Sequence, residues 1–178
     1  MNSYEGGPAL QPTIKPIETR YKGCRFRSRL EARWAVFFDS MHIEWEYEKE
    51  GYNLGALGCY LPDFWLPQVN MWAEVKAKEF TPEERYKILD LACGTHHPVL
   101  MLVGPPDFLT YEATDGYDYL LGEGHMYHLT ESRFYGNTEF QMMPKNEMRV
   151  AIKSDGCYQL ERAINAALSA RFEFGESG

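Results

Sequence analysis

The chain has few cysteines and no long apolar run, and each absence excludes a class of protein. Its four cysteines, Cys24, Cys59, Cys93 and Cys157, lie far apart and form no C-x-x-C pair, which argues against a zinc site and against a disulfide framework. The longest apolar run, "VLMLV", is far shorter than the ~20 residues that a membrane helix needs. We therefore expect a cytoplasmic protein with reduced thiols and no membrane-spanning segment.

Basic charge is also scarce. The chain has 18 basic and 26 acidic residues and a net charge of −8, which argues against strong nonspecific binding to a polyanion. Between Lys15 and Arg33, however, seven basic and two acidic residues give a local net charge of +5. Such a patch suits phosphate groups, and a solvated arginine face is the alternative. Acidic residues gather between Asp107 and Glu139, a region that we expect to face away from any nucleic acid.

The chain does have enough apolar residues for one core. With 178 residues, 44% of them hydrophobic, its length favours a single domain. Residues 1–20 carry glycines and prolines and predict an extended arm, not a signal peptide. A compact core is expected over 21–104 and an irregular acidic region over 105–156, with "MYHLT" and "MRVAIK" as candidate strands in it. Apolar spacing predicts a closing helix over 157–174.

The first helix of the core is predicted to begin at Ser28, because the apolar residues of "SRLEARWAVFFDSMHI" recur at helical spacing. Within it, Glu31 allows two interpretations. Ser28 and Glu31 fit the S-x-x-E capping box, in which the glutamate bonds the backbone at the helix start. At 100° per residue Glu31 also lies beside Phe38 at the border of the apolar stripe, where its carboxylate would look along a sheet. The sequence leaves both interpretations open.

Three strands are predicted between Ile43 and Lys78. Alternation in "IEWEYEKEGY", then "CYLPDFWLP" and "MWAEVKAK", with "GYNLGALG" as a turn, indicates an antiparallel meander. Thr81, Pro82 and Glu84 fit the capped start of a second helix, and "PVLMLVG" is typical of a strand covered on both faces. The order of helix, three strands, helix and strand predicts an α/β fold with a mixed central sheet flanked by helices.

Asp63 and Glu74 stand among aromatic and apolar residues, where a charge is normally costly. Antiparallel pairing of their strands would bring the two carboxylates level, and Lys76 would share the face of Glu74. Carboxylates that close raise each other's pKa unless a cation intervenes. Mg²⁺, which takes oxygen ligands including a carbonyl such as that of Val75, would resolve the conflict. A salt bridge from Lys76 to Asp63 or Glu74 is the alternative.

The pair Pro62-Asp63, then ten residues, then Glu74-Val75-Lys76 resembles the signature of the PD-(D/E)XK nuclease superfamily. The preceding "FRSRLEARWAVFFD" resembles the first helix of small phage-encoded members and of transposon end-cutting endonuclease subunits. The resemblance covers about Tyr21 to Val103. It implies a restriction-endonuclease-like αβββαβ core, followed here by a C-terminal extension that ends in a helix.

The resemblance further implies a phage-encoded, metal-dependent endonuclease that hydrolyses DNA phosphodiester bonds in the host cytoplasm, with Mg²⁺ as cofactor and Mn²⁺ as substitute. Lys76 would position the attacking water or stabilise developing charge. The expected metal ligands are Glu31, Asp63, Glu74 and the carbonyl of Val75. The expected contacts to the DNA backbone are Arg25, Arg27, Arg29 and Arg33.

Two other classes of function stay open at this point. One is a catalytically silent nuclease-fold module that binds DNA or protein, as a homodimer or with another partner, through the acidic region or the C-terminal helix. The net charge of −8 favours it. The other is a different metal-dependent hydrolase or an RNA-directed nuclease, which would have to contact the 2′-hydroxyl of ribose.

Overall fold

A computed structural model describes residues 16–107, 111–114, 125–131, 138–144 and 158–172. Its main sheet pairs strands in the order β11-β10-β9-β8-β7-β6-β3. Only β7 and β8 are parallel to each other, so the sheet is mixed. The strands are β3 (Glu46–Tyr47), β6 (Phe64–Leu66), β7 (Met71–Lys76), β8 (Val99–Val103), β9 (Tyr111–Thr114), β10 (His125–Glu131) and β11 (Thr138–Pro144).

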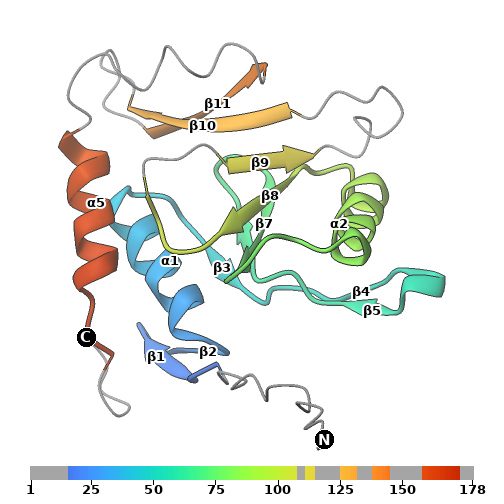
Figure 1. The fold of residues 1–178 in the computed structure, drawn as a ribbon, viewed down its shortest axis with the longest axis horizontal. Coiled ribbons are helices and arrows are strands. Elements are labelled where there is room, and N and C mark those ends of the chain that lie inside the picture. Colours follow the sequence, from blue (N-terminus) through green and yellow to red (C-terminus); the bar gives the residue numbers. More distant parts are fainter. Residues whose placement is uncertain (1–15, 108–110, 115–124, 132–137, 145–157, 173–178) are drawn as a thin grey trace, which may run out of the picture.

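Helices cover both faces of this sheet, which gives a layered α/β fold (Figure 1). α1 (Arg29–Ser40) and α5 (Tyr158–Ser169) pack together on one face, and α2 (Pro82–Thr95) lies on the other. Successive residues of β6 and β7 point to opposite faces. Phe64, Leu66 and Ala73 therefore pack with α1 and α5, whereas Trp65 and Trp72 pack with α2.

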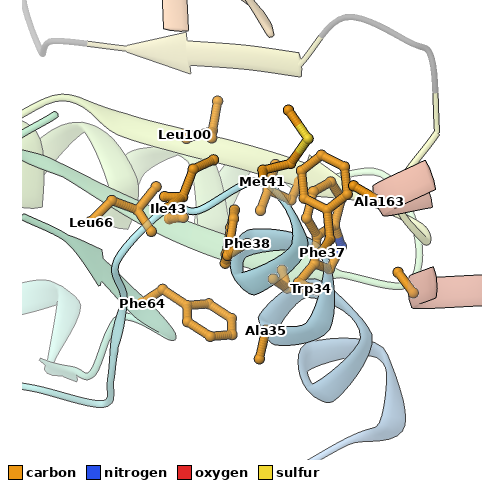
Figure 2. Packing of buried hydrophobic residues seen from close by; sticks show 14 of the residues in the cluster. Trp34, Ala35, Phe37, Phe38, Met41, Ile43, Phe64, Leu66, Leu100 and Ala163 are labelled. Carbon is orange, nitrogen blue, oxygen red and sulfur yellow. The ribbon is translucent and has the colours of Figure 1, made fainter. Parts of the chain in front are cut away.

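The larger core cluster is built on aromatic residues of α1. Trp34, Phe37 and Phe38 are at most 1% exposed, and Figure 2 shows them between Phe64 of β6 and Ala163 of α5. The Trp34 indole Nε1 also donates to the carbonyl of Gly104 at 2.9 Å, which ties α1 to the end of β8. This packing explains the apolar stripe seen in the sequence.

Both predicted helix starts in the core are confirmed. Ser28 is the N-cap of α1, and its Oγ accepts from the backbone N–H of Glu31 at 3.2 Å. Thr81 caps α2, Pro82 occupies the first turn, and Glu84 completes the capping box. These caps satisfy backbone N–H groups that have no partner inside the helix.

The predicted meander is confirmed, with its order β3-β6-β7, but two details differ. "CYLPDFWLP" is two strands, because Pro62 has no N–H to donate and restricts the residue before it. Its first part is β5 (Cys59–Tyr60), which pairs with β4 (Tyr52–Asn53) in a hairpin closed by the short helix η1 (Gly55–Leu57). Figure 1 shows this hairpin extending from the sheet beside α2, where only a turn was predicted.

The ends of the fold also differ from expectation. A hairpin of β1 (Thr19–Tyr21) and β2 (Cys24–Phe26) begins within the predicted arm. β9, β10 and β11 continue the sheet through the region expected to be irregular, and "MYHLT" lies in β10, whereas "MRVAIK" lies outside the described residues. α5 ends at Ser169 rather than near residue 174. Within the described ranges, every helix is too short or too polar to cross a bilayer.

Candidate functional site

The β6–β7 register brings Asp63 and Glu74 together. Phe64 pairs with Ala73, so the next pair in the same register is Asp63 with Glu74, as the sequence predicted. The backbone N–H of Asp63 donates to Glu74 Oε2 at 3.4 Å. In return, Asp63 Oδ2 accepts from the backbone N–H of Val75 at 2.8 Å. Each carboxylate thus bonds the backbone of the opposite strand.

These two carboxylates are buried and repel each other. Asp63 is 3% exposed and Glu74 is 4% exposed. Burial raises the pKa of Asp63 well above its usual range, and the charges of Glu74 and Glu31 raise it further, while Val75 N–H and Arg27 act in the opposite direction. Burial also raises the pKa of Glu74, in part against the effect of Lys76. The site therefore favours any additional positive charge.

Lys76 lies two residues after Glu74 on β7, so the two side chains point to the same face of the sheet. Its Nζ is 3.1 Å from Glu74 Oε1 and 3.4 Å from Glu84 Oε1 at the start of α2. Burial acts to lower the pKa of Lys76, but the Glu74 and Glu84 carboxylates outweigh it and raise that pKa. Lys76 is thus a cation at neutral pH, and the salt bridge considered as an alternative is present.

The Glu31 carboxylate forms hydrogen bonds at the start of α1, and its charge also affects the pKa of Asp63. Its Oε1 accepts from Ser28 Oγ at 2.6 Å, and its Oε2 accepts from the backbone N–H of Arg27 at 3.1 Å and from the Tyr47 hydroxyl at 2.5 Å. Its charge nevertheless contributes to the raised pKa of Asp63. The Ser28 half of the predicted capping box is therefore present, whereas the Glu31 carboxylate bonds the N–H of Arg27, one residue before the N-cap.

The four arginines expected to hold DNA have different environments. Arg27 contacts the carboxylates instead, with Nη2 2.9 Å from Asp63 Oδ1 and Nε 2.7 Å from Glu48 Oε1. Arg25 is exposed and pairs with the exposed Glu18. Arg29 is exposed in the first turn of α1, and Arg33 is half-buried with its Nε lacking a hydrogen-bond partner. Arg25, Arg27 and Arg29 are all exposed, and of these three only Arg27 contacts Asp63.

Four residues around the site were not predicted from the sequence, namely Tyr47, Glu48, Tyr60 and Glu84. The Tyr60 hydroxyl donates to Glu74, and burial followed by that contact raises its pKa. Glu48 follows from the β3–β6 register, because its backbone N–H donates to the Asp63 carbonyl at 2.9 Å. No strand register predicts the contact of Arg27 with Asp63 or that of Glu84 with Lys76, because each joins side chains from different layers of the fold.

The contacts around Asp63 and Glu74 involve more negative than positive groups. In the described part of the chain, two cations and five carboxylates make these contacts, so the formal charge is −3 when every carboxylate is ionised (Arg27 and Lys76; Glu31, Glu48, Asp63, Glu74 and Glu84). Carboxylate oxygens are the donors that Mg²⁺ prefers, and it commonly takes only one or two of them, with waters. Asp63 and Glu74 fit that requirement, although no cluster of three or more His, Cys, Asp and Glu side chains suited to a metal occurs among the described residues.

The expected ligand set is thus brought together in part. Asp63 and Glu74 meet directly, and Val75 lies between Glu74 and Lys76 on the same strand. Glu31 is bonded elsewhere, through Ser28, Tyr47 and the Arg27 backbone. No protein-family model, curated protein or solved structure matches this chain significantly.

Proposed function

We propose that the protein is a metal-dependent endonuclease of the PD-(D/E)XK type, with a restriction-endonuclease-like core, that hydrolyses DNA phosphodiester bonds. The supporting observation is the buried pair of Asp63 and Glu74, opposed in register and surrounded by excess negative charge. A fold accepts such a pair at a cost in stability, and that cost is typical of sites that bind a cation for function.

Mg²⁺ is the proposed cofactor, and Mn²⁺ is its proposed substitute. Asp63, Glu74 and the carbonyl of Val75 would hold the ion, and Glu31 would join them after exchanging its present partners. A bound ion of this kind supplies Lewis-acid polarisation of the phosphodiester and lowers the pKa of water.

Lys76 is the proposed catalytic cation. Its ammonium contacts Glu74 and stays protonated, so it can donate hydrogen bonds to the attacking water or to the phosphate oxygens as negative charge develops. Hydrolysis joins the water oxygen to phosphorus and breaks one phosphorus–oxygen bond to the sugar. The proposed contacts to the DNA backbone are Arg25, Arg29 and Arg33, which would position the duplex without reading its sequence.

Cleavage of supercoiled plasmid tests the proposal. The full chain is incubated with Mg²⁺, with Mn²⁺ or with EDTA, alongside Asp63→Asn and Lys76→Ala. We expect nicking or linearisation by the wild type with either metal, none with EDTA, and a loss on the order of 10²-fold or more in each variant. Asp63→Asn keeps the volume of the side chain, so that a lost activity does not reflect a cavity.

Two variants elsewhere on α2 are matched controls for the charge that each change removes. Lys87→Ala removes a lysine that pairs with Glu83 at 3.0 Å, and Asp90→Asn neutralises an exposed aspartate. Both should cleave at the wild-type rate. Cleavage by Asp63→Asn, or cleavage in EDTA, would contradict the assignment of the site.

A silent nuclease-fold module that binds DNA or protein is the second candidate. Its supporting observation is that each of the two buried carboxylates already has an internal cation as partner, Arg27 for Asp63 and Lys76 for Glu74. This candidate predicts binding of duplex DNA or of a protein partner without cleavage of plasmid, single-stranded or branched substrates under any divalent metal. The apolar face of α5 is not available to such a partner, because Leu160, Ala163 and Ile164 lie in the core with α1.

A further inference from the structure

Arg27 holds Asp63 from the solvent side of the site. Its guanidinium bridges Asp63 Oδ1 at 2.9 Å and Glu48 Oε1 at 2.7 Å. The Arg27 side chain is 56% exposed, whereas that of Asp63 is 5% exposed. A buried carboxylate oxygen is thus paired with a cation that has most of its own surface in water.

The backbone N–H of Arg27 is held by hydrogen bonds that do not involve its guanidinium. The Arg27 N–H is shared by Glu31 Oε2 and the Tyr47 hydroxyl oxygen, each at 3.1 Å, and the next residue is the N-cap of α1. A change of partner at the guanidinium therefore requires only rotation about side-chain bonds. Such rotations of exposed side chains are fast and leave the fold unchanged.

A divalent ion and the Arg27 guanidinium would compete for the same carboxylate. Positive charges at hydrogen-bond distance from one oxygen repel each other, so binding of the ion weakens the Arg27–Asp63 pair. Each of the two cations contacts two carboxylates, but the Arg27 side chain is 56% exposed, whereas that of Lys76 is 34% exposed. Arg27 is the cation with the lower cost of release.

We propose, on the basis of the proposed function, that Arg27 is a displaceable internal counter-ion of Asp63, which a divalent ion releases and which then binds a DNA phosphate. The guanidinium is suited to that second partner, since its planar fork matches two phosphate oxygens. Release by the ion makes metal binding and DNA binding support each other, and the coupling is reciprocal. Arg27 is thus a positioning residue that makes the binding of DNA depend on the presence of metal.

Calorimetric titration of Mg²⁺ into the full chain, without DNA, tests whether the ion competes with Arg27 for Asp63. Arg27→Gln removes the competing cation and should bind Mg²⁺ up to about fivefold more tightly than wild type, the factor expected for loss of one partly exposed ion pair. Arg25→Gln is the matched control, because it removes the same charge from an exposed arginine two residues away that pairs with Glu18. Its affinity for Mg²⁺ should stay within about twofold of wild type.

The outcomes separate this inference from the proposed function. Equal or weaker Mg²⁺ binding by Arg27→Gln, with clear binding by the wild type, overturns the role of Arg27 and leaves the metal site standing. Absence of Mg²⁺ binding in wild type and in both variants contradicts the proposed function itself. Binding that appears only in Arg27→Gln supports the counter-ion role in its strongest form.

Fluorescence anisotropy with a short DNA duplex tests whether the released Arg27 guanidinium binds a DNA phosphate. Lys76→Ala is the common background, so that binding is measured without cleavage in EDTA and in Mg²⁺. We expect Mg²⁺ to raise the DNA affinity at least fivefold in Lys76→Ala and less than twofold in Lys76→Ala with Arg27→Gln. An equal gain in both proteins would show that the freed guanidinium does not contact the phosphate.

Discussion

Replacing Glu74 by glutamine is expected to stabilise the metal-free protein while it abolishes cleavage. Glu74 and Asp63 are opposed in register, and opposed residues of an antiparallel pair have Cβ atoms about 5 Å apart. Two full charges at about that separation repel by at most about 3 kcal/mol at an effective dielectric constant of about 20, and by less where either carboxyl is protonated. The substitution keeps the volume of the side chain and removes this repulsion.

The gain is reduced by the contacts that are lost. The Lys76–Glu74 ion pair is partly exposed and contributes about 1 kcal/mol, and Lys76 keeps its second partner, Glu84. A net gain of about 1–2 kcal/mol remains. In a domain of this length it corresponds to a rise of about 3–6 °C in the melting temperature.

The gain should depend on pH with a defined sign. Folding raises the pKa of Glu74 above 4.5, so this carboxyl favours the folded state at low pH, and that contribution is lost as the pH rises through the folded pKa. Glu74→Gln has no such loss. The difference in melting temperature between the variant and the wild type should therefore be small near pH 4.5 and should grow toward pH 8.

Thermal unfolding in EDTA, followed by circular dichroism from pH 4.5 to 8, measures this difference. Glu84→Gln is the matched control, because it removes the other carboxylate that contacts Lys76. The capping bond from the Thr81 backbone, followed by further contacts, lowers the pKa of Glu84, so its charge stabilises the fold at neutral pH. Glu84→Gln should therefore lose stability slightly. A melting temperature of Glu74→Gln equal to or below that of wild type at pH 8 would show that repulsion between Asp63 and Glu74 does not destabilise the folded protein.

Two further predictions concern other parts of the molecule. Trp34→Phe should lower the free energy of unfolding by about 2–4 kcal/mol in guanidinium titrations, because it opens a cavity and breaks the bond from Nε1 to Gly104; an unchanged midpoint would contradict this. Arg29→Gln should weaken DNA binding and reduce the slope of log affinity against log salt by about 1, whereas an unchanged slope would show that this exposed arginine contacts no phosphate.

The elements that carry the site were predictable because their signals are local. The caps at Ser28 and Thr81 and the alternation in β7 each depend on residues a few positions apart. The pairing of Asp63 with Glu74 followed from a short turn between two strands, since a short turn leaves few registers open. Local patterns of this kind also set the order helix, three strands, helix and strand.

The rest depends on contacts that local patterns do not encode. Arg27 and Asp63 are 36 positions apart, and their ion pair requires the β2 end to lie over β6. The strands β10 and β11 pair with each other and extend a sheet whose other strands lie earlier in the chain. The residues of "GYNLGALG" form a hairpin around η1, whereas their glycine content indicated only a turn. Tertiary contacts decided each of these features.

The packing of α5 on α1 has a consequence for synthesis of the chain. Leu160, Ala163, Ile164 and Ala167 complete the core cluster that contains the aromatic residues of α1. Ala163 is labelled in Figure 2. Roughly 120 residues separate the two helices, so at about 5–20 residues per second a ribosome takes about 6–24 s to deliver the second after the first. During that interval Trp34 and Phe37 lack part of their cover. The nascent chain therefore presents an aromatic surface to chaperones and to other nascent chains until α5 emerges.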